Sequence, residues 1–227
     1  MLYRRAAVLL CAATALLIPE AAGAAVTTPP ADTPNLALMV LQPADLQPGV
    51  RIGAQNYVTP PPGFTAEYGS ALTGATSTSG TKYRLIQDYV ALAPSATVAN
   101  GFYTEQRAAF TSHSGRRALV RALIKEVGKN ADLRSRNFKF GQATSPGVGS
   151  SSFAETLTIK VKHRSVTQVL LAFADGDVYV GLALEAPPGE PIPASDPIAL
   201  ATAIDAHVHT VTAATGATGS TGPSGST

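Results

Sequence analysis

Cysteine is nearly absent from this chain of 227 residues, in which Cys11 is the only one. Cys11 lies inside an apolar run, Ala6–Ile18, that follows two arginines and precedes the small residues Ala22, Gly23 and Ala24. This order is typical of an export signal, and the run is shorter than the about 20 apolar residues of a membrane-spanning helix. We therefore expect residues 1–24 to be removed as a signal peptide, with a retained N-terminal anchor as the alternative.

Cleavage after Ala24 would leave a mature chain without cysteine. Such a chain has no disulfide bond, thiol nucleophile or thiolate metal site, so its fold must depend on its hydrophobic core. A lipid anchor on Cys11 is not expected, because Leu10 is not the small residue that a lipoprotein signal places before its cysteine.

Basic side chains are missing from the last third of the chain. Residues 165–227 contain six acidic and no basic side chains, whereas residues 105–164 contain twelve basic and four acidic ones. The mature chain is near neutral and exported, which argues against a nucleic-acid partner. The basic segment could present a positive face to an anionic envelope polymer or lipid headgroups, or it could be a solvated face partly neutralised by the acidic third. The candidate residues for this face are Arg117, Arg121, Lys125, Arg134, Arg136 and Lys139.

Recognisable catalytic, cofactor and metal motifs are also missing. The sequence contains no Gly-x-Ser-x-Gly elbow and no phosphate-cradling glycine loop after a strand. His207 and His209 fall in an expected helix, where side chains two apart diverge by about 200° and cannot chelate together. Asp175 and Asp177 flank a glycine, and turn chemistry explains both. We therefore expect no catalytic residue, no cofactor and no metal ion.

The strongest structural signal is a hairpin over Val166–Glu185, where Asp175-Gly176 separates two apolar runs. Asp-Gly favours a two-residue turn, which would pair Phe173 with Val178 and fix the remaining register. One face of the hairpin is then almost entirely apolar and must be covered, whereas the other face is mixed. The residues of the apolar face are Thr167, Val169, Leu171, Phe173, Val178, Val180, Leu182 and Leu184.

The remaining periodicities predict an α+β fold. Helical spacing is expected over Ala96–Thr111, Arg116–Val127 and a last segment that begins at Ser195 or Asp196. Further strands are expected at Phe64–Leu72, Tyr83–Leu92, Asp132–Phe140 and Phe153–His163. We predict an antiparallel sheet of about five to six strands with two to three amphipathic helices packed on one face. Leu36–Leu46 is expected to be a short helix or strand followed by a loop, and Tyr57–Gly63 a stiff proline connector.

Composition also divides the chain into segments. Residues 25–35 are a Pro/Thr linker, residues 36–211 are expected to form a single α+β domain, and residues 212–227 are expected to be a disordered Gly/Thr/Ser tail. Four Gly-x-y triplets begin at Gly216, but four triplets are too few for a collagen-like triple helix.

Several short motifs resemble a known group of domains. These are the segment LQPADLQPG (Leu41–Gly49), the helix start at Pro94-Ser95-Ala96 with Phe110 near its end, and the hairpin followed by a closing helix. Together they resemble secreted and lipoprotein domains of high-GC bacteria, and among these the extracellular sensor domain of receptor serine/threonine protein kinases. Related chains often have an acidic turn where this chain has Gly149-Ser150-Ser151-Ser152. The resemblance therefore transfers no functional residue.

The resemblance implies a bacterial envelope domain without a kinase domain. We expect an exported, non-enzymatic protein, secreted or envelope-associated, with no transmembrane segment after signal cleavage. Its partner would be an anionic envelope polymer, a lipid headgroup, or a small apolar ligand held between the sheet and the helices. The alternatives are a structural or interaction module displayed by the Gly/Thr-rich tail, and a hydrolase with unrecognised catalytic residues.

Overall fold

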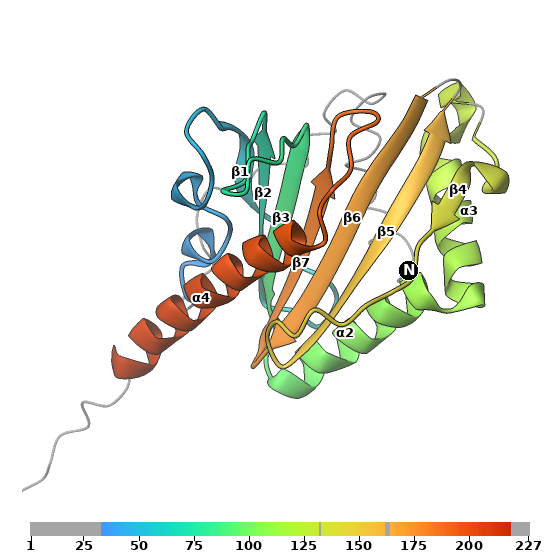
Figure 1. Ribbon diagram of the computed structural model, residues 1–227. Helices are drawn as coiled ribbons and strands as arrows, with labels where there is room; N and C mark the ends of the chain where they lie inside the picture. Colours follow the sequence, from blue (N-terminus) through green and yellow to red (C-terminus); the bar gives the residue numbers. More distant parts are fainter. Residues whose placement is uncertain (1–32, 132, 162–163, 219–227) are drawn as a thin grey trace, which may run out of the picture.

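The computed structural model describes residues 33–131, 133–161 and 164–218, so the predicted signal peptide and most of the predicted linker lie outside the described residues. The chain forms one seven-stranded antiparallel sheet with helices on both sides (Figure 1). The elements are η2 (Leu36–Leu38), η3 (Pro43–Asp45), β1 (Arg51–Val58), β2 (Ala66–Thr73), β3 (Leu85–Leu92), α2 (Ala96–Thr111), α3 (His113–Ala131), η4 (Ser135–Asn137), β4 (Phe138–Phe140), β5 (Ser151–Val161), β6 (Arg164–Asp175), β7 (Val178–Glu185) and α4 (Ser195–Thr218).

The predicted class, α+β with an antiparallel sheet, is confirmed. The strand order is β1-β2-β3-β7-β6-β5-β4, which has one or two strands more than predicted. The helices cover both faces rather than one: α2 and α3 pack on one side, and α4 packs with η2 on the other (Figure 1). The reason lies in the central strand β7, in which all eight residues are buried. A strand that is apolar on both faces needs a cover on each.

The hairpin β6–β7 has the predicted apolar face but a different register. Asp175 pairs with Val178 and Phe173 pairs with Val180, so the predicted pairing of Phe173 with Val178 is wrong by two residues. The loop consists of Gly176 and Asp177, and Gly176 takes the positive φ of +55° that its first position requires. Because side chains alternate with a period of two, a shift by two leaves every residue on its predicted face.

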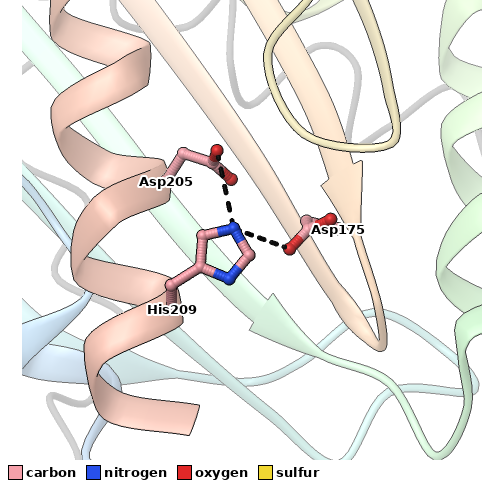
Figure 2. A group of neighbouring side chains, drawn as sticks. All are labelled: Asp175, Asp205 and His209. Carbon is pink, nitrogen blue, oxygen red and sulfur yellow. Dashed lines mark ion pairs between the residues drawn. The ribbon is translucent and has the colours of Figure 1, made fainter. Parts of the chain in front are cut away.

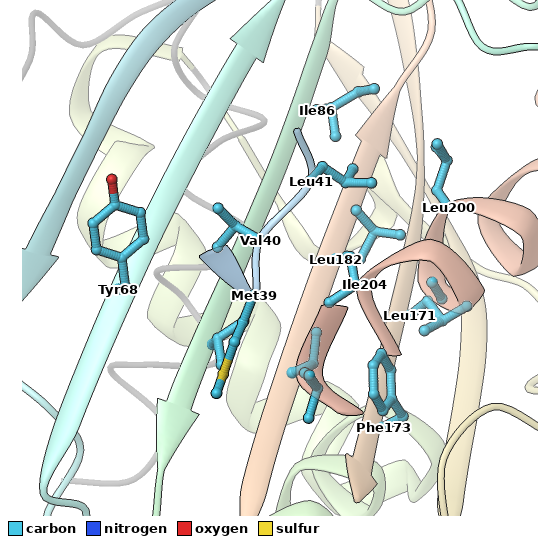
Figure 3. Packing of buried hydrophobic residues seen from close by; sticks show 14 of the residues in the cluster. Met39, Val40, Leu41, Tyr68, Ile86, Leu171, Phe173, Leu182, Leu200 and Ile204 are labelled. Carbon is cyan, nitrogen blue, oxygen red and sulfur yellow. The ribbon is translucent and has the colours of Figure 1, made fainter. Parts of the chain in front are cut away.

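The apolar face of the hairpin is covered by α4 and by the segment around η2. Leu200 and Ile204 of α4 lie over Leu171, Phe173 and Leu182 of the sheet (Figure 3). The second part of the cover is a stretch of side chains from before β1, all of them fully buried: Leu36, Met39, Val40 and Leu41. The sequence interpretation identified α4 as a cover but treated this N-terminal stretch only as a short element and a loop.

The bounds of the remaining helices and strands agree with the predictions only in part. The helix α2 has the predicted bounds, with the Ser95 hydroxyl accepting a hydrogen bond from the Val98 amide at its start. The helix α3 runs from His113 to Ala131, past both ends of the predicted Arg116–Val127, and α4 runs to Thr218, past the predicted domain boundary at residue 211. The strand β4 is shorter than predicted, and β1 was not predicted because its sequence does not alternate. Within the described segments, none of the helices combines the length and apolarity needed to span a membrane.

Candidate ligand pocket

A pocket of about 440 Å³ opens between the β1–β3 end of the sheet and the helix α2. It arises because, within the described part of the chain, α2 packs chiefly over β5, β6 and β7 and not over the neighbouring strands β1–β3. The residues around it come from β1, the β1–β2 connection, β2, β3 and α2: Ala54, Asn56, Val58, Thr59, Pro61, Glu67, Gly69, Ser70, Ala71, Gln87, Asp88, Tyr89, Phe102 and Gln106.

The floor of the pocket is hollow at Gly69. The sheet register places Asn56, Gly69, Tyr89 and Gly181 in one row across four strands. Among the described residues, none would lie within 4 Å of a Cβ atom on Gly69, whereas a Cβ atom on Gly181 would overlap the Tyr89 ring. Tyr89 therefore leans over Gly181 and away from Gly69. Two glycines in one row thus create the cavity, one by accepting the ring and the other by leaving the floor open.

The inner wall of the pocket is aromatic. The Phe102 ring meets the Tyr179 ring edge to face, with centroids 4.8 Å apart, and Tyr89 lies 5.8 Å from the same Tyr179 ring. Phe64 packs on the other side of Phe102 at 5.0 Å. Rings that pack edge to face hold one another in place, so the wall is preformed.

A few polar groups interrupt this apolar surface. Glu67 is two residues from Gly69 on the same face of β2, and Gln106 follows Phe102 by one helical turn of α2. Burial raises the pKa of the Tyr179 hydroxyl strongly, and the negative charge of Glu67 contributes in the same direction. Burial is the largest of these causes, and the Glu67 charge is a minor one.

Asp88 lies in β3 next to Tyr89, and its side chain lies on the face of the sheet opposite the pocket. Its side chain accepts a hydrogen bond of 2.7 Å from the Leu41 amide, and burial raises the pKa of its carboxyl to about 7. This hydrogen bond connects the buried N-terminal segment, residues 36–41, to β3, whose other face carries Tyr89.

The predicted basic residues lie away from the pocket and are all exposed. Arg117, Arg121 and Lys125 follow one another at four-residue spacing on α3, while Arg134 and Arg136 lie at η4. Lys139 lies in β4 between two phenylalanines that pack on the core beneath α2 and α3, so alternation directs Lys139 to the other face. The six residues therefore do not share one surface, and binding of an anionic partner stays a prediction.

We expect that prediction to depend on Arg117, Arg121 and Lys125. Changing all three exposed residues to glutamine should weaken retention on dextran sulfate about tenfold at low salt, because attraction between exposed charges and an anionic polymer is then little screened. Retention of both proteins should disappear at high salt. Equal retention of the wild type and the triple variant at low salt would contradict the prediction.

Arg116, which the sequence interpretation did not single out, is the structurally engaged cation of α3. Its guanidinium pairs with Glu155, donates to the carbonyl oxygens of Phe110 and Gly141, and lies 5.1 Å from the centre of the Phe140 ring. The Glu155 side chain is fully buried. Burial raises the pKa of Glu155 to about 7, although Arg116 opposes this effect.

Asp196, in the first turn of α4, is surrounded by three hydroxyl groups of the β2–β3 connection. It accepts hydrogen bonds from Ser77 at 2.7 Å, Ser79 at 2.7 Å and Tyr83 at 2.8 Å. Burial opposes ionisation, but these hydrogen bonds prevail and lower the pKa of Asp196. The sequence predicted Asp196 only as a possible helix cap.

The two histidines of α4 contact different partners. The His209 Nε2 atom lies 3.5 Å from the Asp175 carboxylate and 3.8 Å from the Asp205 carboxylate (Figure 2). The hairpin residue Asp175 thus pairs with a histidine of α4. His207 lies 3.5 Å from Asp45 and donates through Nδ1 to the Val40 carbonyl oxygen at 3.1 Å. Burial raises the pKa of Asp205, as does the Asp175 charge, while His209 lowers it. These contacts dock α4 on the hairpin end and on the N-terminal cover.

Comparison with known proteins identifies no family for this chain. No protein-family model matches the chain, and no curated protein matches it. Among solved structures, the chain is similar to the extracellular domain of PknH from Mycobacterium tuberculosis, with a TM-score of 0.49 and 10% sequence identity. The match covers 78% of this chain and 98% of that chain. It agrees with the resemblance to receptor-kinase extracellular domains that the sequence motifs indicated.

Proposed function

We propose that this chain is an exported, non-enzymatic domain that binds a small, largely apolar ligand in the pocket between β1–β3 and α2. The observation that carries the proposal is the open floor at Gly69 beneath an aromatic wall. Ligand pockets in proteins are typically apolar concavities of about 300–1,000 Å³ with a few polar groups, and this pocket has both properties.

The open floor is unfavourable for folding alone. A glycine inside a strand costs about 0.5–1 kcal/mol relative to alanine, and protein interiors otherwise pack with few voids. Gly69 is the central residue of this floor, in a strand that pairs on both sides. A residue with a side chain would fit at position 69 and would favour folding. Ligand binding therefore gives a reason for the hollow, whereas stability does not.

The proposal is tested by filling the floor. The probe is 2-naphthylmethanol, whose fluorescence is not masked by tryptophan emission because the chain contains no tryptophan. We expect saturable one-to-one binding to the purified protein, and at least tenfold weaker binding by Gly69→Leu, since a leucine would occupy the space over Gly69. The smaller Gly69→Val variant should give an intermediate loss.

The matched control is Gly101→Leu, at an exposed glycine of α2 whose Cβ position also has no neighbour within 4 Å among the residues that the structure describes. This variant should bind like the wild type, and circular dichroism should show all variants folded. Absence of saturable binding by the wild type, or equal binding by the wild type and both Gly69 variants, would contradict the proposal.

A further inference from the structure

We infer that Asp175, Asp205 and His209 bind a divalent transition-metal ion such as Zn²⁺, which joins α4 to the end of the β6–β7 hairpin. The side chains come from both elements: Asp175 ends β6, while Asp205 and His209 lie one turn apart on α4 (Figure 2). This site is separate from the pocket between β1–β3 and α2, and it does not depend on the ligand proposed there.

The spacing of the three ligand atoms suits a metal ion better than a hydrogen bond. The His209 Nε2 atom lies 3.5 Å from an Asp175 oxygen and 3.8 Å from an Asp205 oxygen, and the three ligand atoms lie within 4.8 Å of one another. Charge-assisted N–H···O hydrogen bonds are about 2.7–2.9 Å long, so both contacts are too long. Zn²⁺ binds nitrogen and oxygen at about 2.0–2.2 Å, which places tetrahedral ligands about 3.3–3.6 Å apart. A small adjustment of the side chains would therefore enclose such an ion.

The charge at this end of the hairpin is unbalanced. Two carboxylates surround one imidazole, and residues 165–227 contain six acidic and no basic side chains. Among the described residues, no lysine or arginine forms an ion pair with Asp175 or Asp205. A divalent ion would neutralise both carboxylates at once, which a single histidine does not do even when it is protonated.

The site is held in position and remains accessible to solvent. The Asp175 and Asp205 side chains are 23% and 19% exposed, whereas the His209 side chain is 64% exposed. The end of β6 is fixed by Ser150, whose backbone amide and hydroxyl both donate to the Ala174 carbonyl oxygen, at 2.9 Å and 2.7 Å. Two covered carboxylates beside an accessible imidazole leave a path for a cation and space for water as a further ligand.

The donor set selects the kind of ion. One imidazole nitrogen and two carboxylate oxygens suit Zn²⁺ and related ions, and three protein ligands with water in the fourth position occur in many zinc sites. Mg²⁺ and Ca²⁺ prefer oxygen ligands alone. Neighbours in sequence did not indicate this site, because Asp175 and Asp177 flank a turn and His207 and His209 diverge along a helix. The fold instead brings Asp175 beside His209.

The test is a titration of the purified protein with ZnCl₂, followed by calorimetry and by thermal unfolding. We expect one site per chain, and an unfolding midpoint raised by about 5–10 °C at a zinc concentration about 100 times Kd, because the ion binds only the folded arrangement. MgCl₂ or CaCl₂ at the same concentration should have neither effect. Asp175→Asn and His209→Ala should each weaken zinc binding at least about tenfold and remove the rise in midpoint.

Each variant has a matched control. Asp177→Asn removes the same charge as Asp175→Asn, on the other side of Gly176, and His113→Ala removes an exposed histidine of α3. Both controls should bind zinc like the wild type, and circular dichroism without zinc should show all variants folded. Should His209→Ala fail to fold, Asp175→Asn still decides the matter, because asparagine keeps the shape of the carboxylate.

Several results would overturn the inference. These are no zinc binding by the wild type, equal effects of zinc and magnesium, and equal losses in Asp175→Asn and Asp177→Asn. Equal losses in His209→Ala and His113→Ala would also overturn it, because they would show that histidines bind zinc without regard to their position. None of these results changes the naphthylmethanol titration, so the proposed function is tested separately.

Discussion

Replacing Arg116 by alanine is expected to lower the free energy of unfolding by about 3–5 kcal/mol, which is the typical cost of breaking a buried ion pair by removing one partner. At pH 8 the fully buried Glu155 carboxyl would have to stay ionised without its cation or take up a proton, and the carbonyl oxygens of Phe110 and Gly141 would lose a donor. Chemical denaturation followed by circular dichroism measures the loss. The control is Arg117→Ala, at the next residue of α3, which is exposed and should change stability by less than about 0.5 kcal/mol.

The loss should also grow with pH. The pKa of Glu155 is about 7 in the folded protein and about 4.3 in an unfolded chain, so its contribution to stability is greatest below about pH 4 and declines as the pH rises toward 7. Arg116 lowers this pKa, and without Arg116 the decline would extend to higher pH. The double variant Arg116→Ala/Glu155→Gln should regain part of the loss at pH 8. A defect of equal size at pH 5 and pH 8 would contradict this account.

Replacing Asp196 by alanine is expected to lower the free energy of unfolding by about 2–4 kcal/mol, since hydrogen bonds to a charged group are worth about 1.5–3 kcal/mol and buried hydroxyls would lose their acceptor. The affected groups are Ser77 and Tyr83, whose bonds to Asp196 are buried. These bonds join the β2–β3 connection to the first turn of α4. The same denaturation measurement applies, with Glu190→Ala, at an exposed residue just before α4, as the control that should remain close to the wild type.

The dependence on pH should run opposite to that of Glu155. The folded protein lowers the pKa of Asp196, so its contribution is present above the unfolded pKa of about 3.9 and is lost as the pH falls through the folded value. The difference between the wild type and Asp196→Asn should therefore be larger at pH 6 than at pH 3. A difference that does not change with pH would show that the carboxylate charge is not what stabilises this contact.

Local patterns were sufficient for the elements whose signal lies within a few residues. The alternation of β6 and β7 predicted the buried face of the hairpin, and helical spacing with a Ser95 cap predicted α2. The register of the hairpin was wrong because Asp175-Gly176 and Gly176-Asp177 are both acceptable turns. Local sequence does not decide between them.

The parts that could not be predicted depend on residues far apart in the chain. Asp196 and Ser77 are 119 positions apart, and Arg116 and Glu155 are 39 apart, so no spacing rule connects them. The pocket has the same origin. Gly69 and Gly181 look like two unremarkable strand glycines until the sheet order places Tyr89 between them. Helices cover both faces of the sheet because β7 lies in its middle. The sequence of β7 indicates this position only through Tyr179 and Ala183, which are buried in the core on the α2 side.

The central claim is that this protein binds a small ligand over Gly69, and nuclear magnetic resonance with ¹⁵N-labelled protein tests it most directly. On titration with 2-naphthylmethanol, we expect saturable shifts of backbone amides confined to β1–β3 and α2, largest at Gly69, Tyr89 and Gln106, and absent in Gly69→Leu. Shifts centred on the exposed α3 residues Arg117, Arg121 and Lys125 or on α4, or no shifts at all, would contradict the claim.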